Sequence, residues 1–313
     1  MWWLDLALNG VVYGSIIVLG SIGLSLIYSI GGFANFAHGD TMTVGAYAAL
    51  VAMGAIAGLG IGFLEGTILG IPYFFIPGLI IGMATAAFVA VITEELVYKP
   101  TDVGPIGFLI MSIGLAFAYR GIIQLGFGPS TRHYDVESLR PIGALLEYEI
   151  RMTYHDIAIV TSALVLVLGV HVLLQYTDFG RMMRAMADNP DLAKASGIHT
   201  RRVLLWTWVM GAGLAGAAGV FLGLFNQVAP RMGFNVLLVI FAAVILGGIG
   251  SVYGAMLGGL LIGLVVQLTP VWGRLGIPIG FEYAEAMAFL VMVLVLLVRP
   301  TGIMGEVVKG GER

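Results

Sequence analysis

The stretch LALNGVVYGSIIVLGSIGLSLIYSI, residues 6–30, carries no charged side chain. As a helix it would extend about 37 Å, and roughly 20 apolar residues suffice to cross a hydrocarbon core of about 30 Å. Similar stretches recur along the chain, in which 59% of the residues are hydrophobic and only 11% are charged. Soluble domains carry about 25% charged residues. The composition therefore excludes an ordinary soluble protein and predicts an all-α protein that crosses the bilayer many times.

Clusters of charged and turn-forming residues divide the sequence into eight or nine apolar segments. The predicted spans cover residues 6–30, 41–59, 78–97, 106–127, 156–176, 203–225, 234–246, 255–271 and 281–298. The segment 234–246 is short for a span, and one interpretation continues it as a broken helix across residues 247–250. The stretch 60–77 contains glycine and proline and is expected to be interfacial or re-entrant. We predict one membrane domain over residues 1–313, a polytopic bundle of about 8–9 transmembrane helices.

Basic residues predict the orientation, because cytoplasmic loops of membrane proteins are enriched in lysine and arginine. The connection 177–202 holds Arg181, Arg184, Lys194, Arg201 and Arg202. The connection 128–155 mixes basic with acidic residues. We therefore expect 177–202 to be a cytoplasmic loop and 128–155 to lie outside. Nine spans would place the N-terminus outside, whereas a re-entrant turn near Gly31 and Gly32 would reverse it.

Small residues recur four apart in two of the later spans. Gly211, Ala215, Gly219 and Gly223 form one such stripe, and the pairs Gly254–Gly258 and Gly259–Gly263 repeat the spacing. Such stripes let helix backbones approach closely. They either pack this subunit internally or form a face for a second subunit.

Residues 34–40, the polar knot, lie between the first two apolar runs. Polar groups at membrane depth are costly and usually functional, so Asn35, His38, Gly39 and Asp40 are candidates for the substrate pathway. Alternatively, Asn35 is a turn residue and Asp40 caps the following helix, a role compatible with either interpretation. His38 is either a hydrogen-bonded structural histidine or a functional one. No second ligand stands near it, so no metal site is predicted.

Few other charges fall within the spans. Arg120, in the outer half of its span, either reaches the surface or contacts a substrate carboxylate, and we include it among the pathway candidates. Glu94 and Glu95 stand at a helix end near Lys99 and are expected to be surface groups. The sequence contains no glycine-rich nucleotide loop and no catalytic arrangement of side chains. Nucleic acid is not expected as a partner.

The connection 177–202 is predicted to form two short helices. Asn189 followed by Pro190 is typical of a helix N-terminus, and Gly197 is typical of a helix end. A short helix without an apolar span of its own either lies among lipid headgroups or docks into the groove of a partner.

Five motifs together give this chain a resemblance to the LivH-type permeases of branched-chain amino acid ABC transporters, over nearly its whole length. They are NFAHGD (35–40), RAMADNP (184–190), AKASGI (193–198), GGIGS followed by GA (247–251 and 254–255) and RPTGI (299–303). The resemblance implies that residues 188–198 are a coupling helix that docks on an ATPase. The implied coupling residues are Arg184, Asp188, Leu192, Ala193, Ala195, Gly197 and Ile198.

The same resemblance implies a non-catalytic permease subunit of an ATP-driven importer. It would translocate branched-chain or related small amino acids across the bacterial or archaeal cytoplasmic (inner) membrane. Implied partners are a LivM-like second permease, two ABC ATPase subunits that bind ATP and Mg, an extracytoplasmic solute-binding protein and membrane lipid. No cofactor is expected in this chain. Alternatives are a permease for urea or short amides, and an ATP-independent channel or secondary transporter, for which the expected row of buried ionisable residues is missing.

Overall fold

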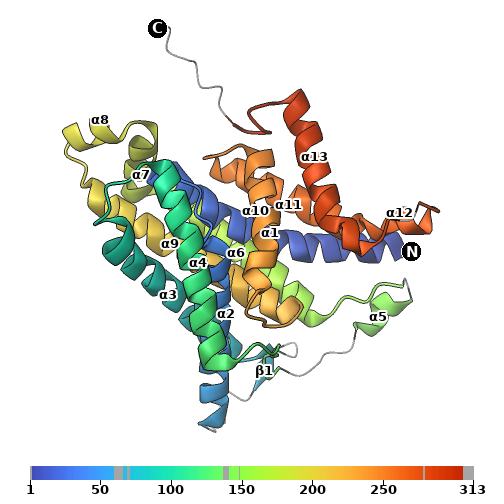
Figure 1. The fold of residues 1–313 in the computed structure, drawn as a ribbon. Coiled ribbons are helices and arrows are strands. Elements are labelled where there is room, and N and C mark those ends of the chain that lie inside the picture. Colours follow the sequence, from blue (N-terminus) through green and yellow to red (C-terminus); the bar gives the residue numbers. More distant parts are fainter. Residues whose placement is uncertain are drawn as a thin grey trace.

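The computed structural model describes residues 2–59, 66–68, 71–136, 141–147, 149–277 and 279–305, and helices joined by loops make up this part of the chain, with one short hairpin (Figure 1). The long helices are α1 (Trp2–Gly31), α2 (His38–Gly58), α3 (Phe75–Thr93), α4 (Pro105–Phe127), α6 (Tyr154–Tyr176), α9 (Thr200–Phe225), α10 (Met232–Gly247), α11 (Val252–Leu268) and α13 (Ala284–Val298). The shorter elements are β1 (Thr67–Ile68), β2 (Ile71–Pro72), the π-helix η1 (Glu94–Tyr98), α5 (Gly143–Leu146), α7 (Asp178–Asp188), α8 (Pro190–Ala195), α12 (Pro270–Arg274) and the 3-10 helix η2 (Phe281–Tyr283).

Eight helical segments of the described residues are long and apolar enough to cross a membrane, and α10 is a shorter apolar helix of 16 residues. Their ends agree with the predicted spans to within about one helical turn. The all-α membrane bundle is confirmed. The boundaries are predictable because charged and turn residues are expelled from the hydrocarbon core and so mark the ends of each span.

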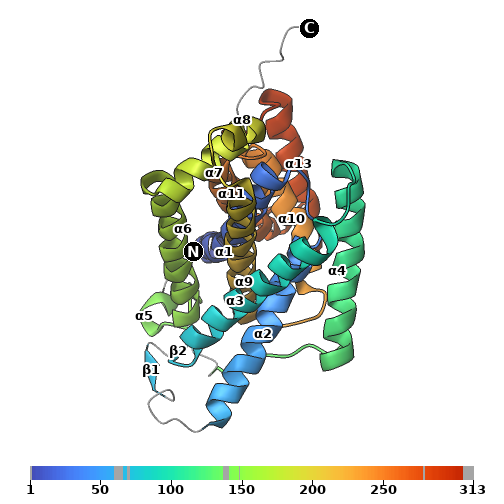
Figure 2. The same ribbon diagram turned by 90° about the vertical axis from the view of Figure 1, so that its left-hand side faces the viewer.

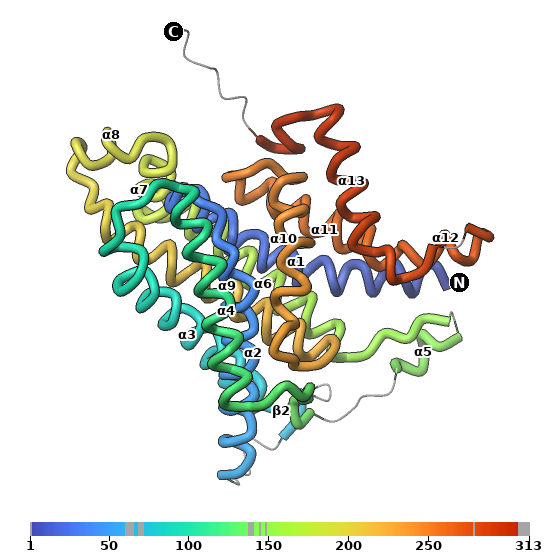
Figure 3. Tube along the Cα trace, in the orientation of Figure 1, coloured from blue at the N-terminus to red at the C-terminus, as the bar shows by residue number. Residues whose placement is uncertain are grey.

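The bundle has a buried centre and an apolar periphery. Helices α1 and α9 are 89% and 78% buried over their most apolar windows, whereas α13 is only 11% buried. In both views α1 passes through the middle of the bundle, and the tube in Figure 3 follows it inward from the N-terminus before the chain turns into α2 (Figures 1, 2 and 3). Exposed leucine and valine side chains on α13 are expected, because lipid is as apolar as they are.

The glycine stripes pack this chain internally. A Cβ atom at Gly211 would lie 2.6 Å from Cγ1 of Ile27 on α1, and one at Gly259 would lie 2.8 Å from the Cα of Val18. Gly219 meets the backbone of Met42 on α2 in the same way. The stripes therefore bring α9 and α11 against α1 and α2, which supports internal packing over a face for a second subunit.

The predicted continuation of the short segment 234–246 as a broken helix is wrong. The chain reverses after α10, and Gly248 and Gly250 adopt φ values of +112° and +84° that favour glycine. Helix α11 then packs antiparallel beside α10, so that Gly258 lies against Ala243. A residue that follows α13 caps the end of α10, because the amide of Met304 donates to the carbonyl of Gly247 at 2.8 Å.

The stretch 60–77 contains no span among its described residues. Residues 60–65, 69 and 70 lie outside the described part of the chain. Around them, Thr67 pairs with Pro72 and Ile68 with Ile71 in an antiparallel hairpin, and α3 begins at Phe75. The predicted interruption between the second and third spans is therefore present here.

The connections predicted to face opposite sides of the membrane lie at opposite ends of the bundle. Helices α7 and α8 lie at the same end as the last turn of α13, at the top of both views (Figures 1 and 2). Helix α5 and the β1–β2 hairpin lie at the other end (Figures 1 and 2). This arrangement is the one expected from the distribution of basic residues.

Candidate functional site

The polar knot runs from the loop before α2 into the first turn of that helix. His38, Gly39 and Asp40 are in the first turn of the helix, and the N-cap residue is Ala37, which makes no side-chain capping bond. The predicted capping role of Asp40 is therefore wrong. Its carboxylate is engaged instead by Arg120 of α4, a partner 80 residues away in sequence.

Asp40 and Arg120 form a bidentate ion pair inside the bundle. Arg120 donates from Nε to Oδ1 at 3.1 Å and from Nη2 to Oδ2 at 2.9 Å. The side chain of Asp40 is 0% exposed and that of Arg120 is 11% exposed. The expectation that Arg120 reaches the surface is thus wrong, because a carboxylate within reach of both guanidinium edges satisfies the charge where water cannot.

Aromatic rings cover the outer side of this ion pair. The guanidinium carbon of Arg120 lies 4.4 Å from the ring centre of Phe234 on α10 and 5.3 Å from that of Phe117. Such contacts attract a cation to the face of a ring. The sequence analysis missed both phenylalanines. A charged residue in a span needs a partner, which makes an acid such as Asp40 a candidate, but their separation of 80 residues gives no local signal for the pair.

The remaining residues of the knot connect four helices. The Oδ1 atom of Asn35 accepts from the amide of Ala37 at 3.0 Å, as predicted for a turn residue. His38 is buried and its Nε2 donates to the carbonyl of Gly20 on α1 at 2.9 Å, the structural role that was one of its two interpretations. The amide of Phe36 donates to Oγ of Ser112 on α4 at 2.9 Å. Movement of α1 or α4 must therefore disturb the knot.

Gly39 brings the knot against α10. A Cβ atom at Gly39 would lie 2.9 Å from the carbonyl carbon of Gly233, so no larger side chain fits without movement of a backbone. The amide of Gly233 donates to Oγ1 of Thr43 at 3.1 Å, one turn further along α2. The knot, Arg120 and the start of α10 thus form one packed unit. Among the described residues no group of three His, Cys, Asp or Glu side chains is placed to hold a metal.

The connection 177–202 forms the two short helices that were predicted. The side chain of Asn189 accepts from the amide of Leu192 at 2.9 Å, and Pro190 opens α8. Gly197 follows the end of α8 with a φ of +86°. Side-chain capping at one end and a glycine at the other hold α8 as a single defined turn.

The two short helices present an apolar side chain outward. Leu192 is 64% exposed, whereas Ala193 beside it and Met183 and Met186 on α7 are buried against the bundle. Ile198 is half-buried, and the other predicted coupling residues are exposed: Arg184, Asp188, Ala195 and Gly197. A cavity of about 410 Å³ lies between α7 and the start of α9, lined by residues that include Phe179, Met182, Ile198 and Trp206.

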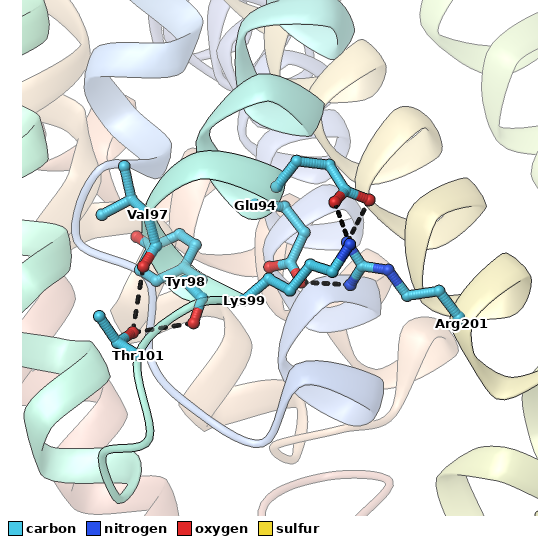
Figure 4. A network of polar contacts seen from close by, with 7 residues as sticks. Glu94, Val97, Tyr98, Lys99, Thr101 and Arg201 are labelled. Carbon is cyan, nitrogen blue, oxygen red and sulfur yellow. Dashed lines mark hydrogen bonds and ion pairs between the residues drawn. The ribbon is translucent and has the colours of Figure 1, made fainter.

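A cluster of four charged side chains lies where α9 begins beside α3 (Figure 4). Arg201 donates from Nη1 to Oε1 of Glu94 at 2.7 Å and from Nη2 to Glu95, which also accepts from Lys99 at 2.6 Å. Glu94 is buried, so the expectation of a surface group is wrong for it and holds only for the half-exposed Glu95. The sequence analysis missed this cluster, because Arg201 is over a hundred residues from its partners.

Comparison with known proteins agrees with this architecture. The model of the family described as branched-chain amino acid transport system / permease component matches residues 6–296. The high-affinity branched-chain amino acid transport system permease protein LivH of Salmonella typhimurium is 32% identical over 98% of this chain and 96% of its own length. A probable branched-chain amino acid transport permease protein LivM of Methanocaldococcus jannaschii is 27% identical over 95% of this chain and 83% of its own length.

A solved structure shares the fold. PsaBC from Streptococcus pneumoniae in complex with Fab matches with a TM-score of 0.51 and 13% identity, covering 95% of this chain and 92% of that one. At this identity the likeness concerns the fold alone. The near full-length match to the family and to its members shows that this chain belongs to the permease components of branched-chain amino acid transport systems.

Proposed function

We propose that this chain is one of two permeases in an ATP-driven importer of branched-chain or related small amino acids, in the cytoplasmic (inner) membrane of a bacterium or archaeon. The whole chain, residues 1–313, would act as one membrane domain. Its family membership supports the class of machine and the class of cargo. The observation that carries the mechanism is the exposed Leu192 on the capped helix α8, because it gives this short helix an apolar point of attachment among polar neighbours.

Helix α8 suits a protein groove better than a lipid surface. A helix that lies among headgroups needs a wide apolar face. The exposed side of α8 offers Leu192 but also Asp191 and Lys194. One apolar side chain surrounded by polar ones is the pattern of an anchor that fills a pocket in a partner protein. We infer that α8 is the coupling helix and that an ATPase subunit holds Leu192.

ATP hydrolysis belongs to other subunits in this proposal. Two ATPase subunits would bind ATP and Mg and drive the permease pair, and a solute-binding protein would deliver cargo outside. The second permease would be LivM-like, which the similarity of this chain to both LivH and LivM proteins supports. Two chains of one fold can pair around a pseudo-twofold axis with the cargo path between them.

The knot and Arg120 are the proposed contribution to the substrate pathway. An amino acid is a zwitterion, so its carboxylate can bind Arg120 and its ammonium group can bind Asp40 while the ion pair between them stays formed. Phe117 and Phe234, both partly exposed beside Arg120, would receive an aliphatic side chain. Urea and short amides carry no charges for this pair, so the geometry favours an amino acid.

The docking step is tested by co-purification of the complex through a tag on this chain. Leu192→Asp is expected to lose most of the ATPase subunits while the second permease still co-purifies, because a charge in an apolar pocket is costly. Lys194→Gln, on the same helix, is the matched control and should retain them. Wild-type amounts of ATPase with Leu192→Asp would refute docking through α8.

A further inference from the structure

The four-residue cluster of Glu94, Glu95, Lys99 and Arg201, the charge joint, connects the docking end of the chain to α3. Arg201 stands four residues after Gly197, in the first turn of α9. Its guanidinium spans two carboxylates on η1, as Figure 4 shows for Glu94. A planar fork can hold two carboxylates in fixed positions, which a lysine ammonium cannot do. A displacement of α8 that moves the start of α9 would therefore reach the end of α3.

The segment that Arg201 holds is a π-helix. The amide of Lys99 donates to the carbonyl of Glu94 at 2.9 Å, five residues back, and Oγ1 of Thr101 donates to the carbonyls of Val97 and Tyr98 at 3.0 and 2.8 Å (Figure 4). Short π-helical turns are rare and are frequent at functional sites. A π-helical turn contains more residues than an α-helical one, so its conversion to α-helix would rotate the side chains that follow Glu94.

Tyr98, at the end of this π-helix, faces the loop that carries the knot. It is buried and stacks on Trp208 of α9 with ring centres 5.6 Å apart, and its ring centre lies 5.1 Å from that of Phe33. Phe33 precedes Asn35 by two residues. Rotation of Tyr98 would therefore reach the knot through Phe33. Contiguous packed side chains of this kind can carry coupling between distant sites.

We propose that Arg201 is a positioning residue that transmits movement of α8 through the charge joint and Tyr98 to the polar knot. The inference rests on the proposed docking of α8. Among the described residues, Nε of Arg201 and the hydroxyl of Tyr98 are both buried without a hydrogen-bond partner. Both ends of this route therefore keep a polar atom that can form a further hydrogen bond when the helices shift.

The test measures uptake per ATP hydrolysed in complexes reconstituted into liposomes. Arg201→Gln and Glu94→Gln should each lower that ratio about 2- to 30-fold while the ATPase subunits still co-purify. The double variant should be no worse than Arg201→Gln alone, because Arg201→Gln already removes the contact with Glu94. Arg181→Gln, which removes an exposed ion pair with Asp178 on α7, is the control and should leave the ratio unchanged.

Three results separate the possible failures. If the wild-type complex lacks bound ATPase or ATP-driven uptake, the proposed function fails before the joint is tested. If the wild type is active and Arg201→Gln or Glu94→Gln keeps the wild-type ratio, or their effects add, the inference about the joint is overturned. If Arg201→Gln does not assemble, Arg201→Lys decides, because it keeps the charge without the fork: a lowered ratio supports the joint, and a wild-type ratio overturns it.

Discussion

Two arginines of this chain meet carboxylates in opposite surroundings. Arg120 binds one carboxylate through two parallel hydrogen bonds, deep in the bundle and under aromatic rings. Arg201 binds two different carboxylates at the end of the bundle, where its side chain is 35% exposed. The first arrangement joins α2 to α4, and breaking it would cost a large amount of free energy. Water can solvate Arg201 and Glu95 when the second arrangement opens, so α9 and η1 can separate at a lower cost in free energy.

The difference follows from the solvent available to each pair. Removing one partner of a buried ion pair leaves an uncompensated charge where water cannot reach it. At Arg201 the loss is smaller, because Arg201 and Glu95 are about one-third exposed and water screens their charges, and only Glu94 is buried. The same chemical change should therefore damage stability at Arg120 and transport at Arg201.

The largest effect is expected for Asp40→Ala, which strands Arg120 inside the membrane. We expect a loss of about 3–5 kcal/mol in folding free energy and low abundance in the membrane. Thermal unfolding in detergent and immunoblots of membranes measure both. The double replacement Asp40→Leu with Arg120→Met should recover most of the stability but none of the transport. A stable, abundant Asp40→Ala protein would show that the pair does not lock these helices.

The next effect is expected for Gly39→Ala, which inserts a methyl group between the knot and α10. Overpacking of a closely packed site costs about 1–3 kcal/mol. Gly54→Ala is the matched control on the same helix, because a Cβ atom there meets nothing within 4 Å. The melting temperature should fall for Gly39→Ala only. Equal melting temperatures for the two variants would contradict the close contact of α2 with α10.

A smaller effect on folding is expected for Gly197→Val, at the docking end. A β-branched residue at its positive φ should cost about 1–2 kcal/mol and displace α8. The permease should still insert, while stimulation of ATP hydrolysis by loaded binding protein should be lost. Gly197→Asn tolerates this backbone conformation better and should keep the stimulation. Full stimulation with Gly197→Val would remove α8 from the coupling mechanism.

The smallest effect is expected for Arg181→Gln, which breaks the fully solvated pair with Asp178 on α7. Exposed ion pairs contribute about 0–1 kcal/mol, so the melting temperature and the uptake should both stay near wild type. A large loss of uptake at normal stability would place Arg181 in a contact with a partner subunit. It would also show that a solvent-exposed side chain of this end of the protein is needed for transport.

The sequence predicts the helices of this protein better than their contacts. Span ends are set locally, because charged and turn residues are excluded from the hydrocarbon core, and the caps of α8 at Asn189 and Gly197 are equally local. The roles of Asp40 and Glu94 depend on arginines 80 and 107 residues away. A local rule assigns Asp40 to a helix cap and Glu94 to the surface. Both assignments are wrong because each acid pairs with a distant arginine, Asp40 with Arg120 and Glu94 with Arg201, and attraction between charges is strong in a medium of low dielectric constant.

Uptake of radiolabelled leucine into proteoliposomes tests whether this chain is a permease of an ATP-driven amino acid importer that is driven through α8. The vesicles contain this chain with its LivM-like partner and the two ATPase subunits, with ATP inside and the binding protein outside. We expect leucine to accumulate against its concentration gradient only when both ATP and the binding protein are present. Leu192→Asp should abolish this accumulation. Accumulation without ATP, or transport of urea in place of leucine, would contradict the proposed function.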